Sequence, residues 1–146
     1  HRDIKPENFG FSKPYREGQP MPSLKLFDVG LAWVLPSPIT DETATQLIPL
    51  PRSGTQMYMA PETWEGMSGA PSDIWGAGLV LYLLLSLDMP FELVRTNTAL
   101  RAIRTNPLSF DTAAWSHVSQ AARDFVSWSL QKEPEKRATT AQPLAD

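Results

Sequence analysis

Residues 1–8 read HRDIKPEN, and this octet decides how the rest of the chain is interpreted. It places a carboxylate (Asp3), an ammonium group (Lys5) and a carboxamide (Asn8) on one short segment. A carboxylate can accept a proton or orient a hydroxyl group, and a carboxamide oxygen is a ligand for a hard cation. An ammonium group can neutralise a phosphoryl oxygen, and phosphoryl transfer depends mainly on positioning and charge neutralisation. The alternative is a polar loop with a turn-forming proline, but the octet fixes too many positions at once to favour it.

Four further motifs follow the octet in order. They are Asp28-Val29-Gly30, Ala60-Pro61-Glu62, the run DIWGAG at residues 73–78, and Arg137. The octet resembles the catalytic loop H-R-D-x-K-x-x-N of protein kinases, and the later motifs resemble the D-F-G, A-P-E and D-x-W-x-x-G signatures of that family. Arg137 stands where the family keeps an arginine that pairs with the A-P-E glutamate. Because the resemblance covers almost the whole chain, it implies the C-terminal lobe of a serine/threonine protein kinase.

The resemblance implies a role for several side chains. Asp3 acts as the base or positions the attacking hydroxyl group, and Lys5 stabilises the transferred phosphoryl group, which makes these two the catalytic residues. The implied nucleotide-binding residues are Lys5, Glu7, Asn8 and Asp28, and the implied Mg²⁺ ligands are Asn8 and Asp28. ATP and Mg²⁺ are therefore the expected cofactors. Without the octet, Asp28 would be read as an ordinary β-turn aspartate.

Lys5 and the pair Gly54-Thr55 resemble the serine/threonine form of the family, because tyrosine kinases use a different catalytic loop. By this resemblance, Thr55 bonds to Asp3 and Lys5 and shapes the peptide pocket. The alternative for Thr55 is a loop residue that caps a short helix. The implied function is transfer of the γ-phosphate of ATP to serine or threonine hydroxyls of a protein substrate.

The sequence pattern predicts a mainly α-helical chain with a small β-hairpin near its N-terminus and a buried central helix. The alternation in residues 24–27 favours a strand, and a loop rich in proline and glycine precedes it at residues 13–23. The apolar run of residues 74–87 is shorter than the ~18 residues that mark a membrane helix, so it fits a core helix. Ser72 is its expected cap, and Pro90 is expected to end it.

The other segments are predicted to be shorter. Residues 36–60 hold four prolines and show no helical periodicity, which indicates a long surface loop. Short helices are predicted over residues 61–66, 96–105 and 119–131, the last capped by Ser119. By resemblance, the partial kinase domain of residues 1–146 divides into a catalytic loop (1–8), an activation segment (28–62) and a helical subdomain (63–146).

Two long-range contacts are implied by the resemblance. Asp73 is expected to accept hydrogen bonds from the backbone N–H groups of His1 and Arg2. The alternative interpretation of Asp73 is an exposed aspartate at the start of a helix, where the helix dipole favours a negative charge. Glu62 and Arg137 are expected to form one buried ion pair, and the alternative for them is two solvated side chains.

The chain also departs from the family. It contains no G-x-G-x-x-G loop, strand lysine or partner glutamate, which clamp the ATP phosphates in kinases. Val29 replaces the phenylalanine of D-F-G, Gly10 replaces a larger apolar residue under adenine, and the hairpin loop at residues 13–22 is longer than usual. We therefore expect these 146 residues alone to have no more than trace kinase activity. The second interpretation is a pseudokinase or a truncated, non-catalytic binding scaffold, but the presence of all four catalytic and metal-binding side chains favours the enzyme.

Regulation by phosphate is a further expectation with an open alternative. Arg2 precedes the catalytic aspartate, and kinases with this arginine often use it to bind a phosphate on the activation segment. Pro51 occupies the usual acceptor position. The remaining acceptors are Thr40, Thr43, Thr45 and Ser53. Alternatively, phosphate does not switch this loop at all.

Composition excludes several classes of protein. The 146 residues carry a formal net charge of −3, which argues against nucleic-acid or anionic-membrane binding. There is no cysteine, which excludes disulfides, thiolate metal sites and cysteine nucleophiles. No signal peptide or membrane segment is recognised in the chain. With ATP as the implied cofactor, the expected location is intracellular, in the cytoplasm.

Overall fold

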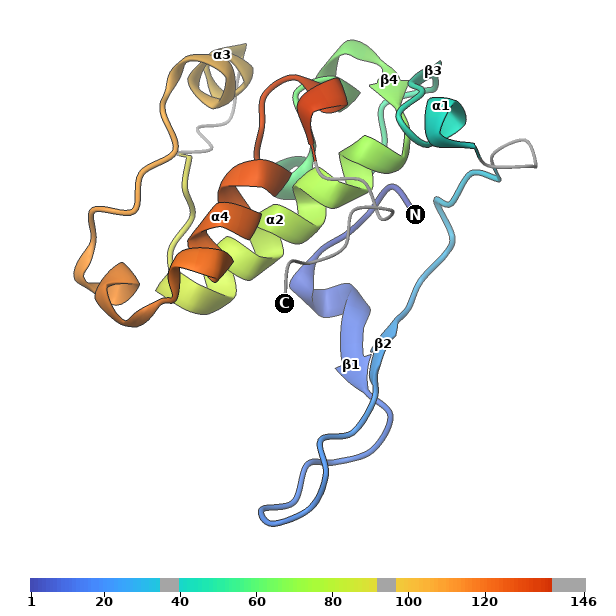
Figure 1. Ribbon diagram of the computed structural model, residues 1–146. Helices are drawn as coiled ribbons and strands as arrows, with labels where there is room; N and C mark the ends of the chain where they lie inside the picture. The colour runs from blue at the N-terminus through green and yellow to red at the C-terminus, as the bar shows by residue number, and fades with distance from the viewer. Residues whose placement is uncertain (35–39, 92–96, 138–146) are drawn as a thin grey trace.

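Helix α2 (Ala70–Ser86) lies at the centre of the structure, and α4 (Gln120–Ser129) packs along it (Figure 1). The computed structural model describes residues 1–34, 40–91 and 97–137. After Asp73, α2 carries no charged residue, and a helix that is apolar on all sides is one that a protein buries. The two helices approach closely at Gly78, because a Cβ atom there would lie only 2.7 Å from Cβ of Ser129.

The hydrophobic core forms where α2 meets the C-terminal segments. The ring centroids of Tyr82 and Trp115 are 4.7 Å apart, and Phe110 meets Trp115 edge-on at 4.6 Å. The Tyr82 hydroxyl donates to the carbonyl of Ser109 at 2.9 Å, so its polar end keeps a partner. The buried core residues are Ala60, Trp75, Leu79, Tyr82, Phe91, Ile103, Trp115, Val126 and Leu130. A buried central helix in a mainly helical chain is thus confirmed.

The remaining elements are short. They are α1 (Asp41–Ala44), α3 (Asn97–Thr105), strands β1 (Phe9–Phe11), β2 (Leu24–Leu26), β3 (Ile48–Pro49) and β4 (Met67–Ser68), and the 3-10 turns η1 (Pro6–Asn8), η2 (Gln56–Tyr58), η3 (Thr63–Glu65), η4 (Ala113–His117) and η5 (Pro134–Lys136). The strands form two separate two-stranded antiparallel sheets, β1 with β2 and β3 with β4.

The predicted hairpin near the N-terminus is confirmed, and it extends away from the helical part (Figure 1). Phe9 pairs with Leu26 and Phe11 pairs with Leu24, so these four side chains share one face. On that side, a groove of about 400 Å³ lies between the hairpin and α2. Gly10 pairs with Lys25 on the opposite face.

Residues 40–60 differ from the predicted surface loop, and residues 36–39 of that prediction lie outside the described residues. Thr40 and Thr43 cap α1 reciprocally, because each side-chain oxygen accepts the backbone N–H of the other residue. Strand β3 pairs with β4, which lies beyond the expected loop. Leu50 and Met59 are buried. The sequence did not indicate strand β3, because a two-residue strand depends on its partner and shows no local periodicity.

The helix boundaries also differ in detail from the sequence predictions. Helix α2 begins at Ala70, so Ser72 lies inside its first turn, where its hydroxyl accepts the backbone N–H of Gly69 at 3.2 Å. The helix ends at Ser86, before Pro90, because Leu87 adopts a left-handed conformation with φ 58°. The predicted cap of α4 is confirmed, since the backbone N–H of Ala122 donates to the Ser119 hydroxyl at 3.2 Å.

Lys132 lies against the aromatic part of the core. Its Nζ is 3.7 Å from the ring centroid of Phe91 and 5.5 Å from a ring centroid of Trp75. Burial lowers the pKa of Lys132 to about 8, and the positive charge of Arg137 acts in the same direction. The folded protein therefore loses this proton at a lower pH than the unfolded chain does.

We expect the free energy of unfolding to rise with pH between about pH 8 and pH 10. In this window the unfolded chain, whose lysine pKa is about 10.4, still binds the proton that folded Lys132 has lost. Urea unfolding at several pH values measures the slope. Lys132→Met should flatten it, whereas Lys136→Met, at an exposed lysine, should not. Equal slopes in the wild type and Lys132→Met would contradict the shift.

Candidate active site

Asp73, in the first turn of α2, holds the start of the octet. The main-chain nitrogens of His1 and Arg2 donate to its two carboxylate oxygens at 2.6 and 2.7 Å. Arg2 has φ 73°, a left-handed conformation that is costly for a residue with a side chain. The predicted contact is thus confirmed, and it fixes the backbone turn that leads into Asp3.

Asp3, Lys5 and Thr55 form one hydrogen-bonded cluster. Lys5 Nζ lies 2.7 Å from Oδ2 of Asp3 and donates to the Thr55 hydroxyl at 3.0 Å. The backbone N–H of Thr55 donates to Oδ1 of Asp3 at 2.7 Å. These contacts confirm the expectation that Thr55 bonds to both residues. They also tie the octet to the segment before the A-P-E motif.

Hydrogen bonding controls the charge state of this cluster. Burial by itself raises the pKa of Asp3, but the hydrogen bonds from Lys5 and Thr55 outweigh it and hold that pKa below its ordinary value. The hydrogen bond to Asp3 raises the pKa of Lys5, and the negative charges of Glu7 and Asp28 add to this effect. Asp3 is therefore an ionised acceptor and Lys5 a cation at neutral pH.

Gly54 allows Thr55 to approach the octet. Its φ is 100°, which favours glycine, and a Cβ atom at this position would collide with the carbonyl oxygen of Arg2. The glycine before Thr55 is therefore required by a close approach of two backbones. A side chain here would push Thr55 away from Asp3.

A backbone hydrogen bond of the hairpin links Asn8 to Phe27, the residue before Asp28. The buried Asn8 side chain donates from Nδ2 to the backbone carbonyl of Asp3 at 2.8 Å. The backbone carbonyl of Asn8 accepts the N–H of Phe27 at 2.7 Å, which brings the residue before Asp28 beside the octet. Asp28 is exposed, with φ 59°, and its Oδ1 accepts the N–H of Gly30 at 3.3 Å.

The side chains of Asn8 and Asp28 offer oxygen donors of the kind that a divalent cation takes together with phosphate. Asn8 is fixed by its amide nitrogen, which leaves the amide oxygen as the atom that could coordinate. Asp28 contributes a carboxylate, and Mg²⁺ commonly takes one or two protein oxygens together with phosphate and water. Within the described residues, no group of three or more His, Cys, Asp or Glu side chains is placed to hold a metal ion.

Glu7 stands apart from the cluster. It is exposed on η1, and its charge raises the pKa of Lys5. Burial raises the pKa of Tyr58, and the charge of Glu7 adds to this rise. Glu7 therefore contributes a negative potential between the octet and the segment that carries Thr55 and Tyr58.

The Arg2 guanidinium contacts two backbone carbonyls of residues 28–62. It donates to the carbonyl of Leu31 at 3.3 Å and to that of Pro51 at 2.5 Å. Among the phosphate acceptors expected from the sequence, Thr40 and Thr43 bond to each other at the start of α1, and the Ser53 hydroxyl is buried. The residues around Leu31 and Pro51 are therefore bonded to Arg2 through main-chain oxygens.

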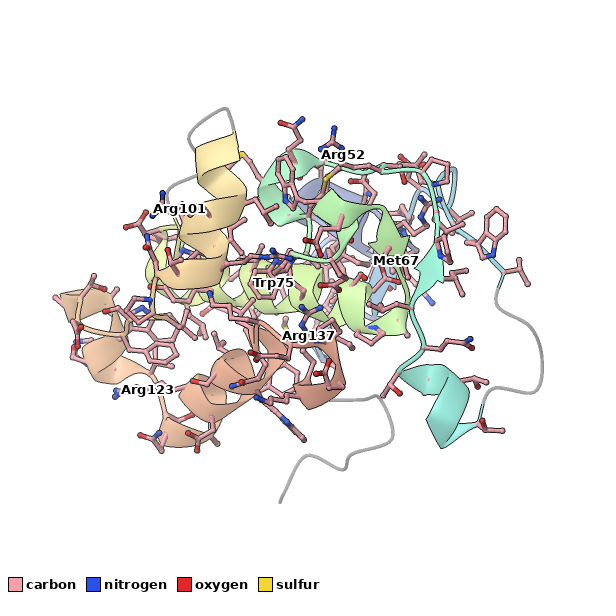
Figure 2. The ribbon with its side chains drawn as sticks, turned by 90° about the horizontal axis from the view of Figure 1, so that it is seen from above. Arg52, Met67, Trp75, Arg101, Arg123 and Arg137 are labelled. Atoms are coloured by element: carbon pink, nitrogen blue, oxygen red, sulfur yellow. The ribbon has the colours of Figure 1, made fainter. Side chains whose placement is uncertain are left out.

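Glu62 and Arg137 form the predicted ion pair. Arg137 donates from both terminal nitrogens to the two carboxylate oxygens at 2.6 and 2.8 Å, and the side chains are 0% and 6% exposed for Arg137 and Glu62 respectively. The guanidinium also lies 5.0 Å from a ring centroid of Trp75, beside which it is seen in Figure 2. Residues 75 positions apart are thus joined in the core.

Two contacts at this site carry no signal in the sequence. The Ser72 hydroxyl donates to Oε1 of Glu62 at 2.8 Å, although its place before an apolar run indicates only a cap. The imidazole Nε2 of His1 lies 2.8 Å from the carbonyl oxygen of Phe27. Both contacts depend on how distant segments pack, so no local pattern could have predicted them.

The chain is similar over nearly all of its length to known proteins. A family model described as protein kinase domain matches residues 1–146. The chain is 37% identical over 145 residues to a CDPK-related protein kinase of Daucus carota, covering 99% of this chain and 22% of the relative. It is 34% identical over 145 residues to a calcium/calmodulin-dependent protein kinase type I of Schizosaccharomyces pombe, covering 99% of this chain and 40% of the relative. The chain thus spans about a fifth to two fifths of these relatives. On this match, the chain belongs to the protein kinase domain family.

Proposed function

We propose that this chain carries the catalytic residues of a protein serine/threonine kinase, which transfers the γ-phosphate of ATP to hydroxyl groups of a protein. The observation that supports this most directly is the cluster of Asp3, Lys5 and Thr55. The cluster combines an ionised acceptor, Asp3, with a cation, Lys5. The lowered pKa of Asp3 keeps this carboxylate deprotonated at neutral pH. Relatives whose names include protein kinase match nearly the whole chain.

Each residue has a defined part in this proposal. Asp3 orients the substrate hydroxyl and accepts its proton as the new oxygen–phosphorus bond forms and the bond to the β-phosphate oxygen breaks. Lys5 neutralises charge on the transferred phosphoryl group. Asn8 and Asp28 would hold Mg²⁺, which neutralises the phosphate charge when bound. Glu7 is placed with the nucleotide-binding residues by the family resemblance alone.

The same proposal assigns the catalytic loop to residues 1–8, the activation segment to residues 28–62 and the helical subdomain to residues 63–146, as in a kinase C-terminal lobe. Its partners are ATP and a protein with serine or threonine hydroxyls. A net charge of −3 argues against nucleic acid as a partner. No helix within the described ranges is long and apolar enough to cross a membrane.

A non-catalytic scaffold is the second candidate, and one observation favours it for the 146 residues by themselves. They contain no glycine-rich phosphate-covering loop. Residues 1–146 alone should therefore transfer phosphate at no more than trace rates, far below the ~1–100 s⁻¹ of kinases. The full polypeptide that carries these residues is the form to test for activity.

Asp28→Ala in the full polypeptide should abolish Mg²⁺-dependent binding of ATP. The substitution removes the carboxylate that Asp28 offers to the cation, so the phosphates lose this bridge to the protein. Calorimetric titration with ATP, with and without Mg²⁺, measures the effect.

Glu17→Ala is the matched control for Asp28→Ala, because Glu17 is an exposed carboxylate in the hairpin loop. It should leave the affinity for MgATP unchanged. Tight, Mg²⁺-dependent ATP binding by Asp28→Ala would remove Asp28 from the site. A wild-type polypeptide that binds no MgATP and phosphorylates no protein would instead favour the scaffold.

A further inference from the structure

Arg52 carries an exposed positive charge that rests on an aromatic ring. Its guanidinium carbon Cζ lies 5.5 Å from the ring centroid of the half-buried Trp64, within the range of a cation–π contact. Figure 2 shows the Arg52 side chain projecting from the surface. Among the described residues, this guanidinium has no hydrogen-bond acceptor and no ion-pair partner. Its N–H donors are therefore free for a ligand, while the ring limits the conformations of the side chain.

The acidic side chains that lie near Trp64 in the sequence already have partners. Oε1 of Glu65, the next residue, lies 2.5 Å from Nη2 of Arg104 on α3. Glu62, two positions before Trp64, is buried in the core ion pair described above. Because each of these carboxylates has its own arginine, neither neutralises Arg52. The surface around Trp64 therefore offers an uncompensated positive charge, in a chain whose formal net charge is −3.

Arg52 lies close to the candidate active site along the chain. The carbonyl of Pro51 accepts the guanidinium of Arg2 at 2.5 Å, and the N–H of Thr55 donates to Oδ1 of Asp3 at 2.7 Å. The chain is thus tied to the octet on both sides of Arg52. Three positions separate Arg52 from Thr55, so their Cα atoms lie at most ~11 Å apart. An extended substrate covers that distance in about three residues, so a side chain within a few positions of the acceptor hydroxyl is in reach of the guanidinium.

We propose that Arg52 selects protein substrates that carry an aspartate or glutamate within a few residues of the acceptor serine or threonine. This inference rests on the proposed kinase function and deepens it by naming a class of substrate. The planar guanidinium presents paired N–H donors, which match the two oxygens of a carboxylate. Because Trp64 already restricts the Arg52 side chain, less conformational freedom is lost when a substrate binds. Arg52 is thus a specificity-determining residue, and Trp64 is the residue that positions it.

A positional peptide library measures this preference with the full polypeptide. Each peptide has one central serine, and glutamate or glutamine stands at one of the three positions on either side of it. At one or more of these positions, the wild type should phosphorylate the glutamate peptide with about five-fold higher kcat/KM, the factor that corresponds to a strong exposed ion pair. The preference should fall as the salt concentration rises, because salt screens a pair of charges at the surface.

Three substitutions of Arg52 distinguish a charge contact from a structural effect. Arg52→Gln should remove the preference for glutamate at that position. Arg52→Lys keeps the charge but not the paired donors, so it should keep part of the preference. Arg52→Glu should reverse the preference, so that a peptide with lysine at that position becomes a better substrate than the glutamate peptide. A merely structural role of Arg52 would not produce such a reversal.

Arg16 provides the matched control. It is an exposed arginine in the loop of the β1–β2 hairpin, which extends away from the helical part that contains α3 (Figure 1). Arg16→Gln removes the same charge from the chain as Arg52→Gln does. It should nevertheless keep the wild-type preference for glutamate, because the charge that it removes lies far from Trp64.

The outcomes separate this inference from the proposed function. A wild type that phosphorylates the glutamate and glutamine peptides equally at every position overturns the inference, while the kinase proposal stands. A glutamate preference that survives in Arg52→Gln and Arg52→Glu also overturns it, because another residue would then bind the acidic side chain. A wild type that transfers phosphate to no peptide or protein overturns the kinase proposal, and the inference falls with it. Thermal unfolding of every variant identifies any loss of activity that comes from loss of fold.

Discussion

Asp3→Asn should lower kcat for protein phosphorylation by about 10²–10⁴-fold in the full polypeptide, the range that a lost acid–base group causes. Asparagine keeps the shape of the side chain but cannot accept a proton from the substrate hydroxyl. The substitution also removes the negative charge that pairs with Lys5, so the cluster loses its ion pair. One of the two carboxylate oxygens, which contact Lys5 and the Thr55 N–H, becomes an amide nitrogen. Steady-state kinetics with MgATP and a protein substrate measures kcat.

The affinity for MgATP should change little in Asp3→Asn, because the carboxylate acts on the substrate hydroxyl and not on the nucleotide. Asp124→Asn is the matched control, since Asp124 is exposed on α4 and accepts a hydrogen bond from the side chain of Gln120 at 2.8 Å. It should leave kcat unchanged. An Asp3→Asn variant that keeps the wild-type kcat would refute the role given to this loop.

The second large effect is expected on stability. Glu62→Ala and Arg137→Ala should each lower the free energy of unfolding by about 3–5 kcal/mol, because each leaves a buried charge without its partner. Arg137 also donates to the carbonyls of Gln131 and Pro71 at 2.8 and 2.9 Å. Such a loss is a large share of the ~5–15 kcal/mol that stabilises a typical domain. Urea or thermal unfolding measures it.

A double-mutant cycle separates the pair from its surroundings. The double variant Glu62→Ala/Arg137→Ala should cost less than the sum of the single variants, since neither charge is then left alone. Glu65 and Arg104 provide the control, because they form an ion pair whose side chains are 48% and 46% exposed. Removing that exposed pair should cost at most about 1 kcal/mol. Small, additive losses at Glu62 and Arg137 would contradict the buried pair.

The sequence predicted the long-range contacts better than some of the local structure. The motifs led to the contacts of Asp73 with His1 and Arg2 and to the pair of Glu62 and Arg137, because each motif implies the partner of its residues. The hairpin and the buried helix followed from alternation and from an apolar run. These features depend on signals that lie within a few residues or within one motif.

The features that sequence analysis missed depend on packing between distant segments. Strand β3 exists because Ile48 pairs with Ser68, and nothing in a proline-rich stretch indicates that partner. Gly10 alone suggested an empty floor under a nucleotide, but the ring of Phe27 crosses from the other strand to cover it. Such complementarity between two residues is visible only when both are placed.

The contacts that shape the site also bear on how the protein folds. Arg2 meets Asp73 across 71 positions, Asp3 meets Thr55 across 52, and Glu62 meets Arg137 across 75. Closing loops of this length costs chain entropy, and contacts of large sequence separation slow folding. The octet should therefore acquire its geometry late, after α2 and the segment around Thr55 have taken their places. An intermediate with helices already formed would still leave Asp3 and Lys5 unpaired, so catalytic competence should be among the last properties gained during refolding.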